Sequence, residues 1–292
     1  MSQIAQLSAE ASEASAALPP LLAEADRAAA SIFGVHGRRA SGPGESFWQY
    51  RQAMPGDAQT RMDWRRSGRS DELFVRETEW ETAQSVFIWP DDASSMRFAS
   101  KNAMSTKARR AAVIGLASAM LLERSGERFA LMEHGGERML RGRTGVDKMA
   151  DVLTRERTAE ELGAPPEARF TNGARALYLS DFFGDMDRVA ESVRTAMSRR
   201  VQGVLVQIND PVEDAFPYRG RVLFESIGGN LTYEADRADT MREAYQKKLA
   251  ERRDSLREIA RRAGWQFRIH RTDQPVTPIL MEIHEMLQAG RR

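Results

Sequence analysis

The sequence contains no cysteine, no long apolar run and almost no net charge, and each absence excludes a class of protein. Without cysteine there is no disulfide, no thiolate metal site and no cysteine nucleophile. No stretch approaches the roughly 18 apolar residues that a membrane span needs. The first residues also lack the basic and apolar regions of a secretory signal. We therefore expect a soluble, cytoplasmic protein.

The charges are nearly balanced, with 43 basic and 42 acidic side chains in 292 residues. No field of one sign draws the whole molecule to nucleic acid or to an anionic membrane, so such binding would need a local patch. Apolar residues make up 41% of the chain, which is enough for a sizeable core. These bounds predict one large α/β domain or two smaller ones.

Familiar catalytic signatures are also missing. The four histidines, His36, His134, His270 and His284, are far apart, and none belongs to a His-Glu-x-x-His pair. There is no Gly-x-Ser-x-Gly nucleophile elbow and no Gly-x-x-x-x-Gly-Lys-Ser/Thr phosphate loop. We therefore expect a protein that is not an enzyme.

Apolar spacing predicts one or two amphipathic helices over residues 3–33, with a break at Pro19 and Pro20. Residues 34–69 lose this period and are rich in Gly, Pro, Asp, Arg and aromatic residues, as turns and short strands are. Beyond them strands and helices alternate. Strands are expected at 73–77, 84–89, 128–132, 176–180, 202–208 and 265–269, a hairpin at 222–224 and 232–234, and helices at 105–123, 146–153, 186–199, 239–263 and 278–288.

This alternation is typical of an α/β fold with a doubly wound, mainly parallel sheet of Rossmann-like type. Right-handed crossovers place the carboxyl ends of the parallel strands at one edge, where open α/β sheets bind ligands. We expect two domains. Residues 1–80 contain the N-terminal helix and the turn-rich, short-strand segment, and residues 81–292 contain the sheet.

Polar side chains follow two of the expected strands. Asp91, Asp92, Ser94 and Ser95 come after one apolar strand, and Asp181 follows another. Carboxylates and hydroxyls are the oxygen ligands that hard cations such as Mg²⁺ prefer. The simpler interpretation is that these residues cap helices and form turns. Both interpretations stay open.

A basic and aromatic cluster lies in the turn-rich segment. Its main members are Arg51, Asp57, Arg61, Asp63, Trp64 and Arg65. Such a cluster can stack bases and neutralise phosphates, as in single-strand binders. Because acidic residues interleave with the arginines, bidentate pairs between arginine and carboxylate explain the pattern more simply. We expect a structural role, with Trp48, Trp64, Trp80 and Trp89 as packing anchors.

A set of short motifs extends over nearly the whole chain beyond the first helix. They are His36-Gly37-Arg38-Arg39, Gly42-Pro43-Gly44-Glu45-Ser46-Phe47, Arg51, Pro55-Gly56-Asp57, Arg61-Met62-Asp63-Trp64-Arg65, Val75-Arg76-Glu77 with Glu79, Asp91 with Ser95-Met96, and Asp210-Pro211 with Glu213 and Pro217. In these motifs the chain resembles the bacterial DUF58 family, whose C-terminal part looks like a von Willebrand factor A domain. The resemblance implies a sheet with helices on both faces. It also implies association with a MoxR-type AAA+ ATPase, in chaperone-like systems that mature client proteins or insert their metal cofactors.

A metal-ion adhesion site is part of what the resemblance implies. Such sites use Asp-x-Ser-x-Ser after the first strand, a Thr from a second loop and an Asp after a later strand. The resemblance aligns Asp91, Ala93 and Ser95 with the three motif positions, Thr144 with the second loop and Asp181 with the third. Mg²⁺ would be the expected ion. For Thr144 an ordinary helix cap is the simpler interpretation.

The implied site is degenerate, because Ala93 has no oxygen to offer. A water can replace the missing hydroxyl, so the site would be weak and not absent. The alternative register of Asp92 and Ser94 ends at Met96, whose sulfur is too soft for Mg²⁺. Either register loses one ligand.

Two functions remain open. The first is a non-enzymatic protein-interaction module, an accessory subunit of the ATPase, that binds an acidic side chain of its partner at this edge. The expected edge residues are Asp91, Asp92, Ser94, Ser95, Thr144 and Asp181. The second is a divalent-metal-dependent hydrolase of a phosphoester that uses Asp91, Asp92 and Asp181. We expect the first.

Overall fold

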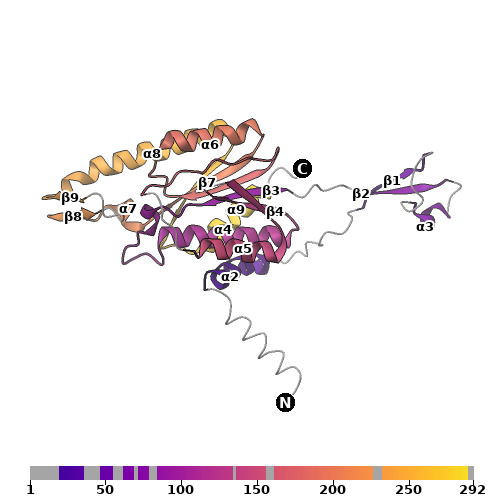
Figure 1. The fold of residues 1–292 in the computed structure, drawn as a ribbon, viewed down its shortest axis with the longest axis horizontal. Coiled ribbons are helices and arrows are strands. Elements are labelled where there is room, and N and C mark those ends of the chain that lie inside the picture. The colour runs from indigo at the N-terminus through magenta and orange to yellow at the C-terminus, as the bar shows by residue number, and fades with distance from the viewer. Residues whose placement is uncertain are drawn as a thin grey trace, which may run out of the picture. The chain divides into compact units, whose positions relative to one another are not determined.

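The computed structural model describes residues 20–35, 47–54, 62–68, 72–78, 84–133, 136–155, 161–225 and 232–288. The chain divides into two compact units (Figure 1). The sheet unit consists of Met1–Gly37 and Gln84–Arg292, and the small unit consists of Arg38–Ala83.

Six strands form the central sheet of the sheet unit. They are β3 (Ser85–Pro90), β4 (Arg128–Glu133), β5 (Gly136–Leu140), β6 (Arg175–Ser180), β7 (Gln202–Asn209) and β10 (Gln266–Arg271). Their order is β10-β7-β6-β3-β4-β5, and among these six β5 alone runs antiparallel to its neighbour. The predicted α/β fold with a doubly wound, mainly parallel sheet is confirmed.

Helices cover both faces of this sheet (Figure 1). On one side lie α2 (Pro20–Val35), α4 (Lys107–Arg124), α5 (Gly142–Leu153) and α9 (Val276–Gln288), and on the other α6 (Met186–Ser198) and α8 (Arg242–Ala263). Shorter elements follow the strand ends: η2 (Ser94–Arg97), α7 (Pro211–Ala215), the hairpin β8 (Val222–Glu225) and β9 (Thr232–Ala235), and η3 (Ala238–Met241). Within the described ranges no helix has the length and apolar character needed to cross a bilayer.

The alternation of side chains along β3 explains the two helical layers. Val86 and Ile88 pack into the core cluster on one face, and Phe87 and Trp89 pack into the cluster on the other. Successive side chains of a strand point to opposite faces. All six residues of β3 are buried, as expected for a central strand of a parallel sheet.

α2 belongs to the sheet unit, which corrects the predicted domain of residues 1–80. Its buried residues, spaced mostly by three or four, are Leu21, Leu22, Ala25, Ala29 and Ile32, and they join the core cluster of α4 and α9. At its rim Arg109 contacts Glu24 at 2.6 Å. The apolar stripe of an amphipathic helix must be covered, and α4 and α9 cover it here.

β5 has no counterpart among the predicted strands. Gly136-Glu137-Arg138-Met139-Leu140 contains only two apolar residues, and Met139 is 41% exposed. An edge strand needs one neighbour and tolerates charged side chains, so its apolar pattern is weak. Its direction matters for the site, because β5 returns the chain to the amino edge of the sheet before α5 begins.

The small unit has its own secondary structure. β1 (Phe47–Gln52) and β2 (Phe74–Thr78) pair antiparallel, and α3 (Trp64–Ser67) lies between them in the sequence. Asp63 N donates to Phe74 O at 2.9 Å, and Phe74 N donates to Ser67 Oγ at 2.9 Å. These bonds attach α3 to β2.

Candidate functional site

The candidate site lies where the sheet changes its winding direction. From β3 the chain crosses to β4 on one side, and it later enters β6 on the other side of β3. The carboxyl ends of β3 and β6 therefore diverge into different loops, and ligands of open α/β sheets bind at such switch points. Asp91 follows β3 directly and Asp181 follows β6, so both predicted carboxylates lie at this point.

The carboxylate of Asp91 is enclosed. Its side chain is 3% exposed, Oδ2 accepts from Ser180 Oγ at 2.6 Å, and Oδ1 accepts from the backbone N of Ala93 at 3.0 Å. Gly163 lies directly against it, so close that a Cβ at Gly163 would overlap the carboxylate. The loop that contains Gly163 thus covers Asp91, and only glycine allows this approach.

Burial raises the pKa of Asp91 to about 7, against the hydrogen bond from Ser180, which lowers it. Charges of Asp181 and Asp92 raise it further. A carboxyl group that is removed from water favours its neutral form unless a cation compensates. Near neutral pH this group is therefore divided between its protonated and ionised forms.

Asp181 lies at the end of the neighbouring strand and has a different partner. It is fully buried, and its Oδ2 contacts Lys107 Nζ at 2.9 Å while Oδ1 accepts from Phe183 N at 3.0 Å. The same Lys107 Nζ contacts Glu213 Oε1 at 2.5 Å and lies 4.9 Å from the centre of the Phe183 ring. One ammonium group therefore connects the loops after β6 and β7.

Lys107 occupies an unusual place for a cation. It is the first residue of α4, it is 1% exposed, and Thr106 before it caps the helix. The amino end of a helix disfavours positive charge, and burial by itself lowers the pKa of a lysine. The charges of Asp181 and Glu213 outweigh burial and raise the pKa of Lys107 above its ordinary value. The ammonium is therefore charged and held in place by this pair.

Glu213 is positioned by the start of α7. Asp210 caps this helix through Val212 N at 2.9 Å, and Glu213 Oε2 accepts from Asp210 N at 2.8 Å, which completes a capping box. The second oxygen of Glu213 is thereby aimed at Lys107. The motif of Asp210-Pro211 with Glu213 was noted in the sequence, but no role was predicted for Glu213. The Asp-Pro-x-Glu pattern after an apolar strand is the signal that predicts this geometry.

The remaining residues of the first loop lie near these groups. Met96 is fully buried, and its Sδ accepts from Asp181 N at 3.2 Å. Ser95 N donates to Glu161 O at 2.9 Å, and its Oγ is buried without a hydrogen-bond partner among the described residues. Asp92 is exposed and Ser94 half-buried. The structure therefore brings the first and third predicted loops together.

Thr144 was expected at the same edge, and this prediction is wrong. It lies in the first turn of α5, directly after β5, and is exposed. Because β5 runs antiparallel, Leu140 at its end pairs with Phe129 at the start of β4. Thr144 is thus at the amino edge of the parallel strands, opposite Asp91 and Asp181.

The residues present do not fit the implied metal site. Ala93 offers no oxygen, the Asp91 carboxylate is directed to Ser180 and Gly163, and Lys107 takes the Asp181 oxygen. In the described part of the chain no three His, Cys, Asp or Glu side chains form a group that could hold an ion. Ser95 Oγ is the one expected ligand oxygen left unengaged there.

The predicted structural residues of the small unit are partly described. Arg65 N donates to Asp63 Oδ1 at 3.1 Å, and Arg51 pairs with Val75 in the β1–β2 ladder. Asp57, Arg61 and the side chain of Arg51 lie outside the described residues.

Of the four predicted tryptophan anchors, Trp89 is 4% exposed and packs edge-on against Tyr178 at 5.5 Å, which confirms its role. Trp64 is 60% exposed and is not an anchor. Trp80 and the side chain of Trp48 fall outside the described residues.

A sequence profile of the family described as "Protein of unknown function DUF58" matches residues 49–255. A search among curated proteins returned no match.

Three solved structures are similar to the chain. The conserved hypothetical protein BatB from Bacteroides thetaiotaomicron is 11% identical, with 71% of this chain and 100% of that chain covered and a TM-score of 0.40. An aerotolerance-related membrane protein from Bacteroides fragilis NCTC 9343, with multiple mutations to serines, is 10% identical over 70% of this chain and 98% of that chain, with a TM-score of 0.40. An uncharacterized membrane spanning protein from Vibrio fischeri is 17% identical. The match covers 72% of this chain and 98% of that chain, with a TM-score of 0.20.

Proposed function

The chain belongs to the DUF58 family, and we propose that it is a non-enzymatic protein-binding module whose docking surface is the carboxyl edge of the sheet. The observation that carries this proposal is Lys107. Its ammonium lies between Asp181 and Glu213, at the strand end where the resemblance to von Willebrand A domains implies a metal ion. A tethered ammonium supplies positive charge but no open coordination position, so the edge is organised without a metal.

The partner contact then differs from the one that a metal would make. Asp91 and Asp181 are too buried to reach a partner, so they hold the loops in place. The exposed part of the edge is formed by residues such as Asp92 and Arg97. We propose that these loops bind a MoxR-type AAA+ ATPase, the partner that the family resemblance implies, and that the pair acts on a client protein.

Direct binding of the purified ATPase from the same genome tests this proposal. With Mg-ATP present, wild-type protein immobilised on a biosensor should bind the ATPase, and Asp92→Ala should weaken binding. Asp147→Ala is the matched control, because Asp147 is also an exposed aspartate but lies in α5, which begins at the amino edge. Equal loss for both variants, or no binding by the wild type, would contradict the proposal.

In the part of the chain that the structure describes, no arrangement of side chains favours the hydrolase alternative. It needs Asp91 and Asp181 to face one ion, and they are engaged separately, by Ser180 and by Lys107. Calorimetric titration with millimolar Mg²⁺ and Mn²⁺ should give no binding heat. A saturable heat that is lost in Asp181→Asn would restore the metal and reopen this alternative.

A further inference from the structure

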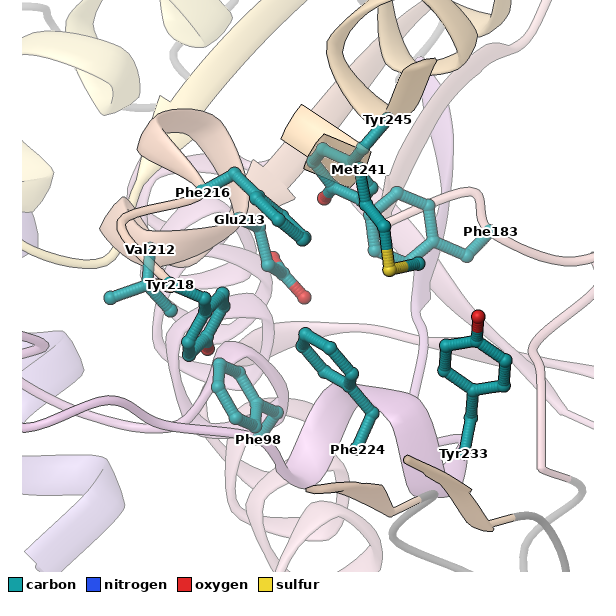
Figure 2. Close-up of a pocket in the computed structure, with 10 residues that line it drawn as sticks. All are labelled: Phe98, Phe183, Val212, Glu213, Phe216, Tyr218, Phe224, Tyr233, Met241 and Tyr245. Carbon is teal, nitrogen blue, oxygen red and sulfur yellow. The ribbon is translucent and has the colours of Figure 1, made fainter. Parts of the chain in front are cut away.

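A pocket lined by aromatic side chains lies beside Lys107, at the same edge of the sheet. Its volume is about 360 Å³, at the lower end of the range of small-ligand sites. Most of the lining residues are phenylalanines and tyrosines. The lining residues come from the loops after η2 and β6, from α7 and its following loop, from the hairpin, and from η3 and α8. Figure 2 shows the rings arranged around a common space.

The concentration of rings is high for this protein. Seven of the ten lining residues are Phe or Tyr, and the whole chain has 12 Phe and 5 Tyr. Phe216 forms the base of the cluster, stacked on Tyr245 at 4.8 Å and on Phe224 at 5.9 Å. Phe216 is buried, whereas Phe98, Phe183 and Phe224 are half-buried. Much apolar ring surface is thus left facing the pocket.

The hairpin supplies the outer wall. Phe224 and Tyr233 are directly opposite in the β8–β9 ladder, so their side chains share one face. Tyr233 is 57% exposed although it lines the pocket. Leu223, 60% exposed, points to the opposite face because side chains alternate along a strand. The pocket is therefore accessible past Tyr233.

The charged groups around the pocket balance one another. The carboxylates are those of Asp181, Asp210, Asp214 and the half-buried Glu213, and the cations are Lys107, Arg242, Arg252 and Arg253. Among the described residues that line the pocket Glu213 alone is charged, so the wall carries a carboxylate and no cation, which favours a cationic ligand over an anionic one.

Burial and the nearby carboxylates raise the pKa values of two lining tyrosines. Burial raises the pKa of Tyr218, and the charges of Asp210 and Glu213 raise it further. The pKa of Tyr245 is raised by burial and then by Glu213 and Asp214, against an opposing effect of Arg253.

We infer that this aromatic pocket binds a basic side chain, arginine in the first place, presented by a protein partner. Aromatic faces attract cations, most strongly where the site is desolvated, and a guanidinium also stacks on rings. The pocket wall already holds one cation in this way, since Lys107 Nζ lies over Phe183. An aliphatic side chain would fill the same volume but would gain no cation–π attraction from the rings.

This inference rests on the proposed function in one respect, that a protein partner supplies the side chain. Binding to the pocket itself is measured without any partner. The two proposals therefore fail separately. If the peptide binds and the ATPase does not, the pocket inference stands and the proposed partner is wrong. If the ATPase binds and the peptide does not, the pocket inference alone is wrong.

The test uses the full chain labelled with 3-fluorotyrosine and observed by ¹⁹F NMR. Its five tyrosines are Tyr50, Tyr178, Tyr218, Tyr233 and Tyr245. The last three line the pocket, and the fully buried Tyr178 reports on folding. The probes are N-acetyl-Gly-Arg-Gly-amide, the same peptide with neutral citrulline, and the same peptide with leucine.

The arginine peptide should shift the three pocket resonances saturably and leave Tyr178 unchanged. Citrulline should bind roughly tenfold more weakly, as expected for loss of a desolvated cation–π contact. Tyr233→Ala should weaken arginine binding by roughly two- to tenfold, and Leu223→Ala, the matched control on the other face, should not. Leucine or citrulline binding as tight as arginine binding would overturn the inference in favour of an apolar anchor, and no shift with any peptide would overturn it outright.

Discussion

The ends of β3 and β6 are neighbours in the sheet, and each carries a buried aspartate, yet the two carboxylates are accommodated by opposite means. Asp91 has hydrogen bonds from Ser180 and Ala93, and in the described part of the chain no cation contacts it. Asp181 contacts the ammonium of Lys107. A buried carboxyl group either stays protonated or pairs with a cation, and adjacent strands show the two solutions.

This difference explains why the edge departs from a metal site. A divalent ion needs ionised carboxylates that face a common point. At the β3 end burial raises the pKa of Asp91 to about 7, so part of the charge is removed by a proton. At the β6 end the charge is already neutralised by a lysine that the fold itself supplies. The two strand ends are thus neutralised independently, one by a proton and the other by a lysine.

Removing the ammonium should have the largest effect. Lys107→Met leaves Asp181 and Glu213 buried without their cation, and breaking a buried pair by removing one partner costs about 3–5 kcal/mol of unfolding free energy. Urea unfolding followed by circular dichroism measures this loss. Lys101→Met, at an exposed lysine of the preceding loop, should change stability by less than about 0.5 kcal/mol. Similar values for both variants would show that Lys107 does not organise the β6 end.

The effect of Asp91→Asn on the free energy of unfolding should depend on pH. The folded-state pKa of Asp91 is about 7 and its ordinary value is 3.8. Between these values the folded chain holds a proton that the unfolded chain has released, so wild-type stability falls as pH rises from about 4 to 7. Asp91→Asn cannot ionise and lacks this loss. Relative to the wild type it should gain on the order of 4 kcal/mol between pH 4 and pH 8, since one pKa unit corresponds to about 1.4 kcal/mol.

The measurement is the difference in unfolding free energy between Asp91→Asn and wild type across that range. Asp147→Asn is the matched control and should give a nearly flat difference, because it removes an exposed carboxylate in α5 that is not among the charges acting on Asp91. A flat profile for Asp91→Asn as well would mean that Asp91 is ionised throughout, and the contrast between the two strand ends would disappear.

The sequence predicted the fold well because its central strands are buried on both faces. Ser85–Pro90 and Arg175–Ser180 are continuous buried runs, and such runs remain visible without any alignment. β5 was missed because an edge strand carries charged residues, and this one omission moved Thr144 to the wrong edge of the sheet. A single antiparallel strand reverses the edge at which the following helix starts.

For the site, the sequence predicted the two aspartates and missed what surrounds them. Asp91 and Asp181 follow apolar strands directly, so their place depends on local pattern alone. Lys107 is 74 residues from Asp181 and 106 from Glu213, and their contact depends on how three loops fold back over the edge. Gly163, which covers Asp91, belongs to no recognisable motif. The metal-site prediction was based on oxygen ligands, so it gave no indication that a lysine would be the cation paired with Asp181.

The smallest effects on the free energy of unfolding should come from alanine substitutions of Ser180, at the end of β6, and Ser95, after β3. Ser180 Oγ donates to Asp91 at 2.6 Å and accepts from Phe182 N at 2.9 Å, so Ser180→Ala should cost roughly 1–3 kcal/mol of unfolding free energy. Ser95 Oγ is buried with no hydrogen-bond partner among the described residues. Removing an unsatisfied hydroxyl relieves its desolvation cost, so Ser95→Ala should be neutral or stabilising by up to about 1 kcal/mol. Thermal unfolding with and without millimolar Mg²⁺ measures both, and a Mg²⁺-dependent stability that Ser95→Ala abolishes would show that the β3 end retains an ion after all.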